Sequence, residues 1–432
     1  MLRPMMFAAT LLCASAAVGQ DTEEPPEVTE IREQVPGIMK ELEELRGKKF
    51  KKAVAVKYQS EDDFKAWMQE QVDEQYPEER AVRDVKLLSA VGLLEAGFDL
   101  RKCVIDAMAG QAMAYYDPAQ GTFFVLKPHM QPEMTRVYVL HELQHALQDQ
   151  TYDLKTKMAR FEGPGFDRED EAVAFKFVME GEATYLMLKY ALEQAGQGGM
   201  LEMQLQMMGT SSREQMAKME KMQAQMTNDK ATMETLAQRD ALPNYIYNQL
   251  IDPYNKGAWF CYQLVKNNGG HVALDELFEN IPQSSEQVLH PEKCLGADRD
   301  EPVVLELPDL SEQVGAKLIA KNTLGELNLR TMFQELTNDP KVKACAGWDG
   351  DRIHAYASGE QEWASIVWLT TWDSEQDAKE FAAALDELKA KGPPPLASAD
   401  VSVHGKDVLI VGNVDEEKLE AVKAAALEGA TR

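Results

Sequence analysis

The sequence predicts an α+β protein, built as a large, mainly helical domain followed by a small C-terminal α+β domain. Its 432 residues suffice for two or three domains and at least one substantial core. Apolar residues recur at helical spacing through much of residues 31–300. Acids and prolines then thin the apolar pattern around residues 296–308, and alternating apolar segments follow. This change indicates a domain boundary with a sheet beyond it.

The N-terminal stretch, MLRPMMFAATLLCASAAVGQ, is typical of a secretory signal. Arg3 supplies the basic start, residues 5–18 form the apolar core, and small residues lead to a cleavage site after Gly19. The apolar run is short for a membrane anchor. A lipid attachment at Cys13 is disfavoured by the bulky leucine before it. We therefore expect residues 1–19 to be removed and the protein to be exported, to the periplasm or the extracellular space.

The composition is acidic, with a formal net charge of −27. Removal of the signal takes away one positive charge and makes the chain more negative still. Nucleic acid and anionic lipid both bind basic surfaces, so this charge excludes them as partners. No stretch after the signal is long and apolar enough to cross a bilayer, and we expect no membrane span.

Four cysteines remain after the signal, and they show no CxxC spacing, which disfavours a cysteine-zinc site. In an exported chain they permit two disulfides in three connectivities. Cys261 with Cys294 is the preferred pair, and free buried thiols are the alternative. The full set is Cys103, Cys261, Cys294 and Cys345.

The elements before the central motif can be placed in order. Residues 20–30 are acidic and carry prolines, which predicts a disordered leader. A helical pattern begins near Ile31, and residues 51–58 alternate as a strand does. Ser60, followed by acids, predicts a helix start. Residues 112–127 predict a β-hairpin, because apolar and aromatic residues flank a DPAQG turn.

Helices dominate the middle of the chain. One carries the motif HELQHALQDQ, and a second runs from about Glu169 to Gln194. Residues 195–240 are rich in Met and Gln, and we interpret them as a helical insertion or lid. Methionines near helical spacing there are more often an apolar helix face than a soft-metal site, since no Cys or His joins them. A further helix over residues 250–270 ends at two glycines.

The C-terminal domain, residues 305–432, combines alternating segments with two helices. Residues 353–357 and 363–372 predict strands, and residues 401–414 predict a hairpin around Gly405. A helix, SEQDAKEFAAALDELKA, lies between them, and another ends the chain. These elements predict a mostly antiparallel sheet.

The motif HELQHALQDQ, residues 141–150, has the HExxH spacing of a metal site. On a helix, His141 and His145 share one face and can reach one zinc ion. Glu142 lies on the flank of that face, where it can deprotonate a zinc-activated water. Three leucines fall on the opposite face and would anchor the helix in a core. They are Leu140, Leu143 and Leu147.

A zinc site of this kind needs a third protein ligand. The HExxHxxGxxH pattern is excluded, because Thr151 would be that ligand and no glycine stands at position 148. A glutamate from the second helix is the alternative. Glu180 shares its side of that helix with apolar residues, whereas Glu182 shares its side with charged ones. Because a buried carboxylate needs a partner, we expect Glu180 to be the ligand and Glu182 to face solvent.

Two supporting roles have several candidates each. Asp149 lies one turn past His145 and is a candidate for orienting a histidine; capping the helix end explains it equally well, and Gln148 carries the same ambiguity. For a donor to the oxyanion, His290 is the preferred candidate. The tyrosines Tyr115, Tyr116 and Tyr254 compete with it. The hairpin 112–127 can also offer an edge strand to an extended peptide.

At these residues the chain resembles the zincin superfamily of metallopeptidases, on its gluzincin side. That group joins HExxH to a downstream Glu-Gly on a second helix, here Glu180-Gly181. Further stretches are similar to a family of mostly uncharacterised exported bacterial zincin-like proteins. The resemblance implies a zinc peptidase fold, with a mixed sheet beside two active-site helices. Those stretches are YYDP (115–118), EGEAT (180–184), PYNKGAWF (253–260), SSEQVLHPEK (284–293), AGWDGDR (346–352) and TWDSEQDAKEF (371–381).

The expected function is that of an exported zinc metallopeptidase acting on a peptide or protein. His141, His145 and Glu180 hold Zn²⁺, Glu142 is the general base, and His290 is the candidate for stabilising the tetrahedral intermediate. Two alternatives remain open. One is a binding protein that keeps the scaffold without turnover, and the other is a metal-dependent hydrolase of a non-peptide bond.

Overall fold

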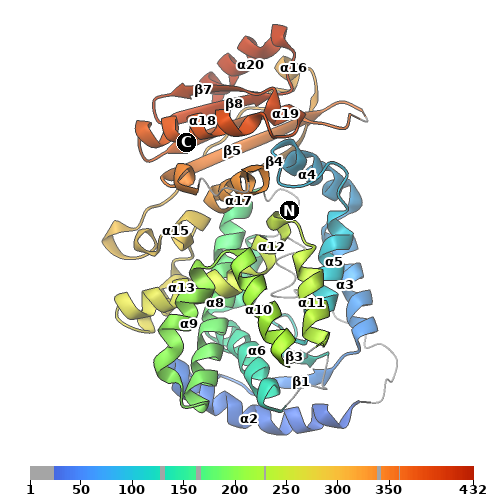
Figure 1. Ribbon diagram of the computed structural model, residues 1–432, viewed down its shortest axis with the longest axis vertical. Helices are drawn as coiled ribbons and strands as arrows, with labels where there is room; N and C mark the ends of the chain where they lie inside the picture. The colour runs from blue at the N-terminus through green and yellow to red at the C-terminus, as the bar shows by residue number, and fades with distance from the viewer. Residues whose placement is uncertain (1–23, 127–131, 162–166, 228–229, 338–341, 360) are drawn as a thin grey trace.

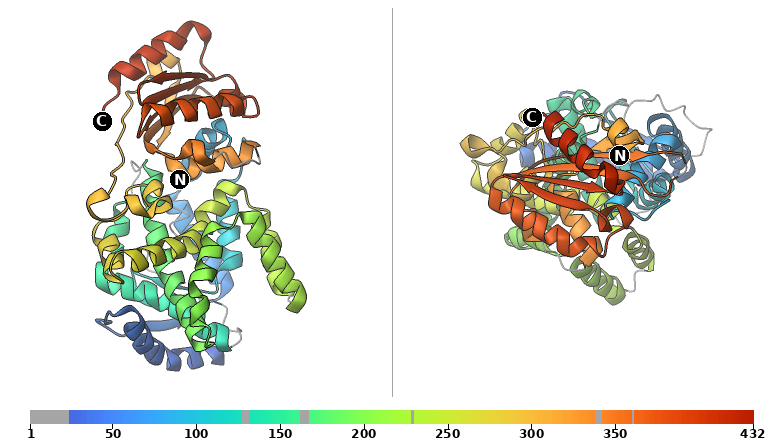
Figure 2. Two further views of the ribbon diagram at one scale, coloured as in Figure 1. Left: turned by 60° about the vertical axis from the view of Figure 1, so that its left-hand side comes forward. Right: turned by 90° about the horizontal axis from the view of Figure 1, so that it is seen from above.

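The computed structural model describes residues 24–126, 132–161, 167–227, 230–337, 342–359 and 361–432. The molecule is elongated, with the C-terminal sheet and its helices at one end and α2 with the first sheet at the other (Figure 1, Figure 2). Helices and two sheets make it an α+β protein, as predicted. The expected signal, residues 1–19, lies outside the described residues.

The N-terminal part is mainly helical. In the described part of the chain, no helix combines the length and apolar character needed to cross a lipid bilayer. The helices are α2 (Pro26–Arg46), α3 (Glu61–Gln75), α4 (Glu78–Ala90), α5 (Leu100–Gln111), α6 (Pro132–Tyr152), α7 (Leu154–Ala159), α8 (Glu169–Gln194), α9 (Leu201–Thr210), α10 (Arg213–Thr227), α11 (Lys230–Asp240), α12 (Asn244–Leu250), α13 (Asp252–Asn267), α14 (Val272–Glu279) and α15 (Ser285–Leu289). Short 3₁₀ turns cover Gly198–Met200, Pro291–Lys293, Gly296–Asp298 and Val342–Cys345.

The start of α2 corrects the predicted disordered leader over residues 26–30, which are helical; residues 20–23 of that leader lie outside the described residues. The helix begins at Pro26, because proline suits the first helical position and Val28 starts an apolar stripe that Ile31 and Val35 continue. All three side chains are buried in the core. The acidic and proline-containing composition of this segment made the apolar stripe hard to recognise in the sequence.

The predicted helix start at Ser60 is confirmed. The Oγ atom of Ser60 accepts a hydrogen bond from Asp63 N at 3.1 Å.

The first sheet is small and mixed, and it lies beside the motif helix. Its strand order is β1-β3-β2, with β1 parallel and β2 antiparallel to β3. The predicted hairpin is present, and Tyr116 pairs with Phe123 across it. Asp117 Oδ1 accepts the Ala119 N–H at 2.8 Å in the turn. Because β2 stands last in the order of the described strands, it is an edge strand of this sheet. The bounds are β1 (Ala55–Tyr58), β2 (Ala114–Asp117) and β3 (Thr122–Val125).

The C-terminal part is a sheet of order β4-β5-β6-β8-β7 in which all pairs are antiparallel. The predicted strands and hairpin are present, while β4, a partly exposed edge strand, was not predicted. The strands are β4 (Lys317–Asn322), β5 (Trp348–Ala357), β6 (Ser365–Trp372), β7 (Asp400–His404) and β8 (Asp407–Gly412). The helices are α16 (Ser311–Val314), α17 (Gly325–Thr337), α18 (Glu375–Lys389), α19 (Pro394–Ala397) and α20 (Glu416–Gly429).

The main hydrophobic core is continuous between the two parts. Strand residues of β6 alternate, so Ile366 and Trp368 enter the main core. Val367 and Leu369 enter a second, smaller core that includes Val422 of α20. The sheet is thus covered on both faces and joined firmly to the N-terminal helices. This arrangement holds α8 and α17 against each other beneath it.

The four cysteines in the described residues form no disulfide, which corrects the preferred pairing of Cys261 with Cys294 and agrees with the alternative of free thiols. All four of Cys103, Cys261, Cys294 and Cys345 are free thiols. The Sγ of Cys261 lies 3.9 Å from the carbonyl oxygen of Val178, inside the α8–α13 contact. Burial raises the pKa of the Cys294 thiol to about 12, so this group stays protonated and unreactive.

Candidate metal centre

Two neighbouring helices, α6 and α8, bring two imidazoles and a carboxylate to one point. His141 and His145 lie one turn apart on α6, and Glu180 faces them from α8. The Nε2 atoms of the two rings are 3.2 Å apart. The Oε2 atom of Glu180 lies 3.2 Å from His141 Nε2 and 3.3 Å from His145 Nε2. The structure thus brings the three predicted ligands together as a group that can hold a metal ion.

The electrostatics of this group favour a cation. Burial alone would raise the pKa of Glu180, but the imidazoles of His145 and His141 hold it below its usual range. Burial likewise disfavours a charged His145, yet the Glu180 carboxylate raises the pKa of that imidazole to about 9. Glu180 Oε1 is buried and has no hydrogen-bond partner among the described residues. A buried, ionised carboxylate with an unused oxygen is a good ligand for a metal ion.

Glu142 lies beside the cluster, next to His141 on α6. The backbone N–H of Tyr116, in the edge strand β2, donates to Glu142 Oε2 at 3.0 Å. This hydrogen bond fixes Oε2 of Glu142 and leaves Oε1 available to a second hydrogen-bond donor. Burial raises the pKa of Glu142 above its ordinary value. A fixed carboxylate with a raised pKa is well suited to accept a proton near neutral pH.

Gln148, three positions after His145, orients that histidine. Its Nε2 donates to the carbonyl oxygen of Met179 at 3.0 Å and to Glu182 Oε2 at 2.8 Å. Its Oε1 is therefore the acceptor at 2.9 Å from His145 Nδ1, and the imidazole proton lies on Nδ1. Because the pKa of this imidazole is about 9, a metal ion would displace a proton from Nε2, and the Nε2 lone pair would then face the metal position. The sequence offered this residue as an ambiguous candidate, since an amide at that spacing also fits a helix end.

Asp149 does not orient a histidine, which corrects the role considered for it. Its Oδ2 accepts a hydrogen bond from the hydroxyl of Tyr116 at 2.9 Å. Burial raises the pKa of Asp149. The carboxylate therefore ties α6 to the hairpin that also holds Glu142, and its effect on the cluster is indirect.

Glu182 is fully buried, which corrects its expected place on a solvated face. It forms an ion pair with Arg46, from the C-terminal end of α2, and accepts from Gln148. Arg46 also donates to Asp275 Oδ1 at 2.8 Å and to the hydroxyl of Tyr152 at 3.1 Å. Because Arg46 lies 136 positions before Glu182, helical spacing alone could not reveal the partner.

Two glycines let α8 and α13 cross in close contact. A Cβ on Gly181 would overlap the backbone of Gly257, and one on Gly257 would lie 2.6 Å from the carbonyl oxygen of Phe177. Only glycine fits where two helix backbones approach this closely. The crossing places Tyr254, one turn before Gly257, beside the ligand Glu180.

Tyr254 is the tyrosine that the fold brings to the cluster. Its ring stacks on His141 with 5.8 Å between centroids and 19° between planes. Burial, with the Glu180 and Glu142 carboxylates, raises the pKa of Tyr254 well above its ordinary value. The phenol is therefore a neutral hydrogen-bond donor beside the metal position. It was one of the competing candidates in the sequence.

His290 lies elsewhere, which corrects its preferred assignment as the oxyanion donor. It follows α15, and its Nε2 lies 3.0 Å from Glu326 Oε2 on α17. The carboxylate of Glu326 raises the pKa of His290, and Arg330 lies within 3.3 Å of the same Nε2. His290 does not line the cavity beside the metal ligands. Its place is in an ionic contact between α15 and α17.

A second acidic group, in the loops near α15, has its charge satisfied by a lysine. Glu286, Asp300 and Asp373 have ligand atoms close enough together for a metal ion. Lys293 Nζ lies between them, 2.8 Å, 2.9 Å and 2.7 Å from their oxygens in that order. The ammonium group thus occupies the position that a cation would take.

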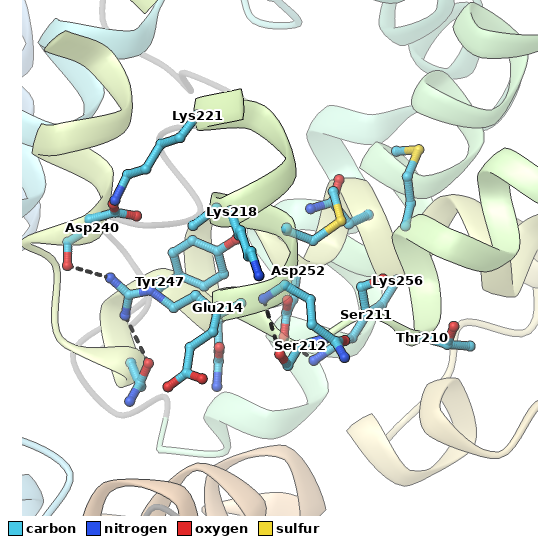
Figure 3. Close-up of a pocket in the computed structure, with 18 of the residues that line it drawn as sticks. Thr210, Ser211, Ser212, Glu214, Lys218, Lys221, Asp240, Tyr247, Asp252 and Lys256 are labelled. Carbon is cyan, nitrogen blue, oxygen red and sulfur yellow. Dashed lines mark hydrogen bonds and ion pairs between the residues drawn. The ribbon is translucent and has the colours of Figure 1, made fainter. Parts of the chain in front are cut away.

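A cavity of about 380 Å³ opens onto the candidate metal position. Its walls include Phe64 of α3, Met108 of α5 and Met187 of α8, together with the strand β2. A larger pocket of about 1190 Å³ lies alongside and shares the lining residue Asn255 with it. Figure 3 shows the charged side chains of this larger pocket.

Those charges are largely paired with one another. Lys221 forms an ion pair with Asp240, and Lys256 forms one with Asp252 (Figure 3). Histidine and cysteine are absent from the described residues that line this pocket. The group that can hold a metal ion therefore lines the smaller cavity, together with Glu142.

Comparison with known proteins identifies only the C-terminal part. Residues 312–423 match a family model described as a domain of unknown function, DUF8575. No curated protein and no solved structure matches the chain. The matched segment does not include the His141, His145 and Glu180 cluster, so the cluster must be interpreted from its own chemistry.

Proposed function

We propose that this protein is an exported zinc-dependent metallopeptidase, with His141, His145 and Glu180 as ligands and Glu142 as general base. The spacing of the three ligand atoms carries the proposal. Two ligand atoms about 2.0–2.1 Å from zinc at the tetrahedral angle lie roughly 3.3–3.4 Å apart. The separations here are 3.2 Å, 3.2 Å and 3.3 Å. Two imidazoles and one carboxylate also leave a fourth position open, as hydrolytic zinc sites do.

The surrounding residues can perform the steps of peptide hydrolysis. When bound, a zinc ion lowers the pKa of water and polarises a carbonyl group. Glu142, held through Oε2, accepts the proton of the attacking water on Oε1 and delivers it to the leaving amine. The Tyr254 hydroxyl donates a hydrogen bond to the carbonyl oxygen as that oxygen gains charge. Gln148 keeps His145 in the tautomer that binds metal.

The edge strand favours a peptide over a non-peptide substrate. Among the described strands β2 is the last in the sheet order, so one of its sides is not paired with another of these strands. Ala114 and Tyr115 of β2 line the cavity beside the ligands. An extended peptide can pair with such an edge through its main chain and cross the metal position.

Export is part of the proposal and rests on the signal-like residues 1–19. A protein expressed from the full coding sequence should be recovered outside the cytoplasm with Gln20 as its first residue. Mass spectrometry of the N-terminal peptide checks this. Retention of residues 1–19 on a cytoplasmic protein would contradict it.

The test of the activity is cleavage of a peptide library by the zinc-loaded protein and by the Glu142→Gln variant. We expect cleavage by the wild type, a loss of about 10²–10⁴-fold in rate in the variant, and equal zinc content in both. Zinc bound without cleavage by either protein would instead favour a binding protein. Cleavage that persists in the variant would exclude Glu142 as the base.

A further inference from the structure

The cavity at the metal position is mainly apolar, with one basic residue. Phe64, Met108 and Met187 contribute apolar side chains from three different helices. Arg239 is the only lysine or arginine among the described residues that line the cavity. A guanidinium beside a mainly apolar cavity attracts an anion that enters it.

Arg239 comes from the last turn of α11, in the insertion 195–240. Its side chain is 16% exposed. It forms an ion pair with Glu220 of α10, and within the described residues its Nε is buried without a hydrogen-bond partner. The Nη2 group is thus engaged by Glu220, whereas the Nε–H on the same edge of the guanidinium is not. A carboxylate can bind an arginine through two parallel hydrogen bonds, and Nε is one of the donors that do so.

The backbone of Arg239 is held in place by a second arginine. Arg213, at the start of α10, donates to the carbonyl oxygens of Arg239 at 2.9 Å and Asp240 at 2.8 Å. It also donates to Asn244 Oδ1 at 2.8 Å and lies 4.4 Å over the ring of Tyr247. Figure 3 shows Asp240 and Tyr247 at this junction. The end of α11 is therefore fixed to α12, and the guanidinium of Arg239 is presented to the cavity from a rigid position.

We propose that Arg239 is a specificity-determining residue that binds a carboxylate of the substrate, so that the protein selects peptides with an apolar residue near a negative charge. The inference rests on the proposed peptidase function. The carboxylate is either the C-terminus of a peptide or an acidic side chain, and the shared chemistry is a planar anion paired with a guanidinium. Before substrate binds, Glu220 forms an ion pair with Arg239. The carboxylate of Glu220 therefore competes with the substrate carboxylate for the guanidinium of Arg239.

The experiment measures peptide binding to the zinc-loaded Glu142→Gln protein by calorimetry. Four peptides share one apolar sequence and differ only in a C-terminal acid or amide and in an Asp or Asn residue. We expect at least one acidic form to bind about tenfold tighter or more than its neutral partner. In the Arg239→Gln, Glu142→Gln protein this preference should disappear, and Arg239→Lys should retain part of it. If the peptide with a C-terminal acid binds more tightly than its amide, the carboxylate is the peptide C-terminus. If the Asp peptide binds more tightly than the Asn peptide, the carboxylate is an acidic side chain.

Two further variants, each made in the Glu142→Gln protein, keep the test decisive. Arg83→Gln removes an exposed arginine of α4 that lies outside the cavity lining, and it should keep the full preference. Glu220→Gln removes the competing carboxylate and should strengthen the binding of acidic peptides without weakening that of neutral ones. Equal binding of acidic and neutral peptides, or a preference that survives Arg239→Gln, overturns the inference. If the wild type cleaves acidic and neutral peptides equally well, the inference about Arg239 is overturned, while the proposed peptidase function is not.

Discussion

His145 donates its Nδ1 proton to the side-chain amide of Gln148, three residues later on the same helix, across 2.9 Å. Gln148 is itself fixed by the carboxylate of Glu182, which an arginine from α2 neutralises. A chain of contacts therefore runs from the start of the molecule to the imidazole that faces Glu180. It determines which ring nitrogen is free to bind a metal ion.

The Gln148→Ala variant should bind zinc about 10–100-fold more weakly, because His145 loses the acceptor that sets its tautomer. Competition with a chromophoric chelator measures the affinity. The matched control is Asp149→Asn at the next position, because the Asp149 carboxylate accepts a hydrogen bond from the Tyr116 hydroxyl and not from a histidine. Equal affinities in the Gln148→Ala variant and the wild type would show that Gln148 does not position the ligand.

The Gly257→Ala variant should lower the free energy of unfolding by about 1–3 kcal/mol, because the added Cβ meets the carbonyl oxygen of Phe177 at 2.6 Å. Zinc affinity should fall as well, since α13 and α8 must move apart. Urea unfolding and zinc titration check both effects. Gly37→Ala in α2 meets no atom within 4 Å and should be neutral or slightly stabilising. A Gly257→Ala protein as stable as Gly37→Ala would contradict the close crossing.

The Arg46→Met variant should lose about 3–5 kcal/mol of stability, because Glu182 is left buried with an unpaired charge. The double variant Arg46→Met, Glu182→Gln should be more stable than Arg46→Met alone. Urea unfolding of the wild type, Arg46→Met, Glu182→Gln and the double variant completes the cycle. Additive losses in the double variant would mean that the two residues are not coupled.

The stability of the fold should depend on pH through His354 in β5. Burial, with Arg352 and Lys321 nearby, lowers the pKa of His354 to about 4, from 6.5 in an unperturbed histidine. Between these pH values the unfolded chain binds a proton that the folded chain does not, so stability falls as pH drops from about 6.5 to 4. The full effect is on the order of 3 kcal/mol. Urea unfolding of His354→Gln across this range should show a smaller loss than the wild type, and equal slopes would contradict the assignment.

The grouping of the candidate ligands could be predicted because it depends on local geometry. His141 and His145 share a helix face by their spacing, and Glu180 stands out as an acid on an apolar helix side. The hairpin beside them was visible in its turn residues and flanking aromatics. These features need only a few neighbouring residues to be recognised.

Features that depend on distant parts of the chain were not visible. Glu182 lies on the side of α8 with several charges, and its burial depends on Arg46 of another helix. The sequence favours His290 as the oxyanion donor, yet the fold pairs it with Glu326. Arg239 belongs to the insertion 195–240, and it lines the cavity through the tertiary fold. Sequence spacing carries no information about such contacts.

The central claim is that His141, His145 and Glu180 form one zinc site, and zinc binding by equilibrium dialysis tests it most directly. The wild type should bind one zinc ion per chain at this site. Glu180→Gln should lose more than the roughly 10–100-fold in affinity expected for an outer partner. Glu171→Gln, on the same helix and paired with Arg160, should bind as the wild type does. A Glu180→Gln protein that binds zinc as tightly as the wild type would contradict the claim.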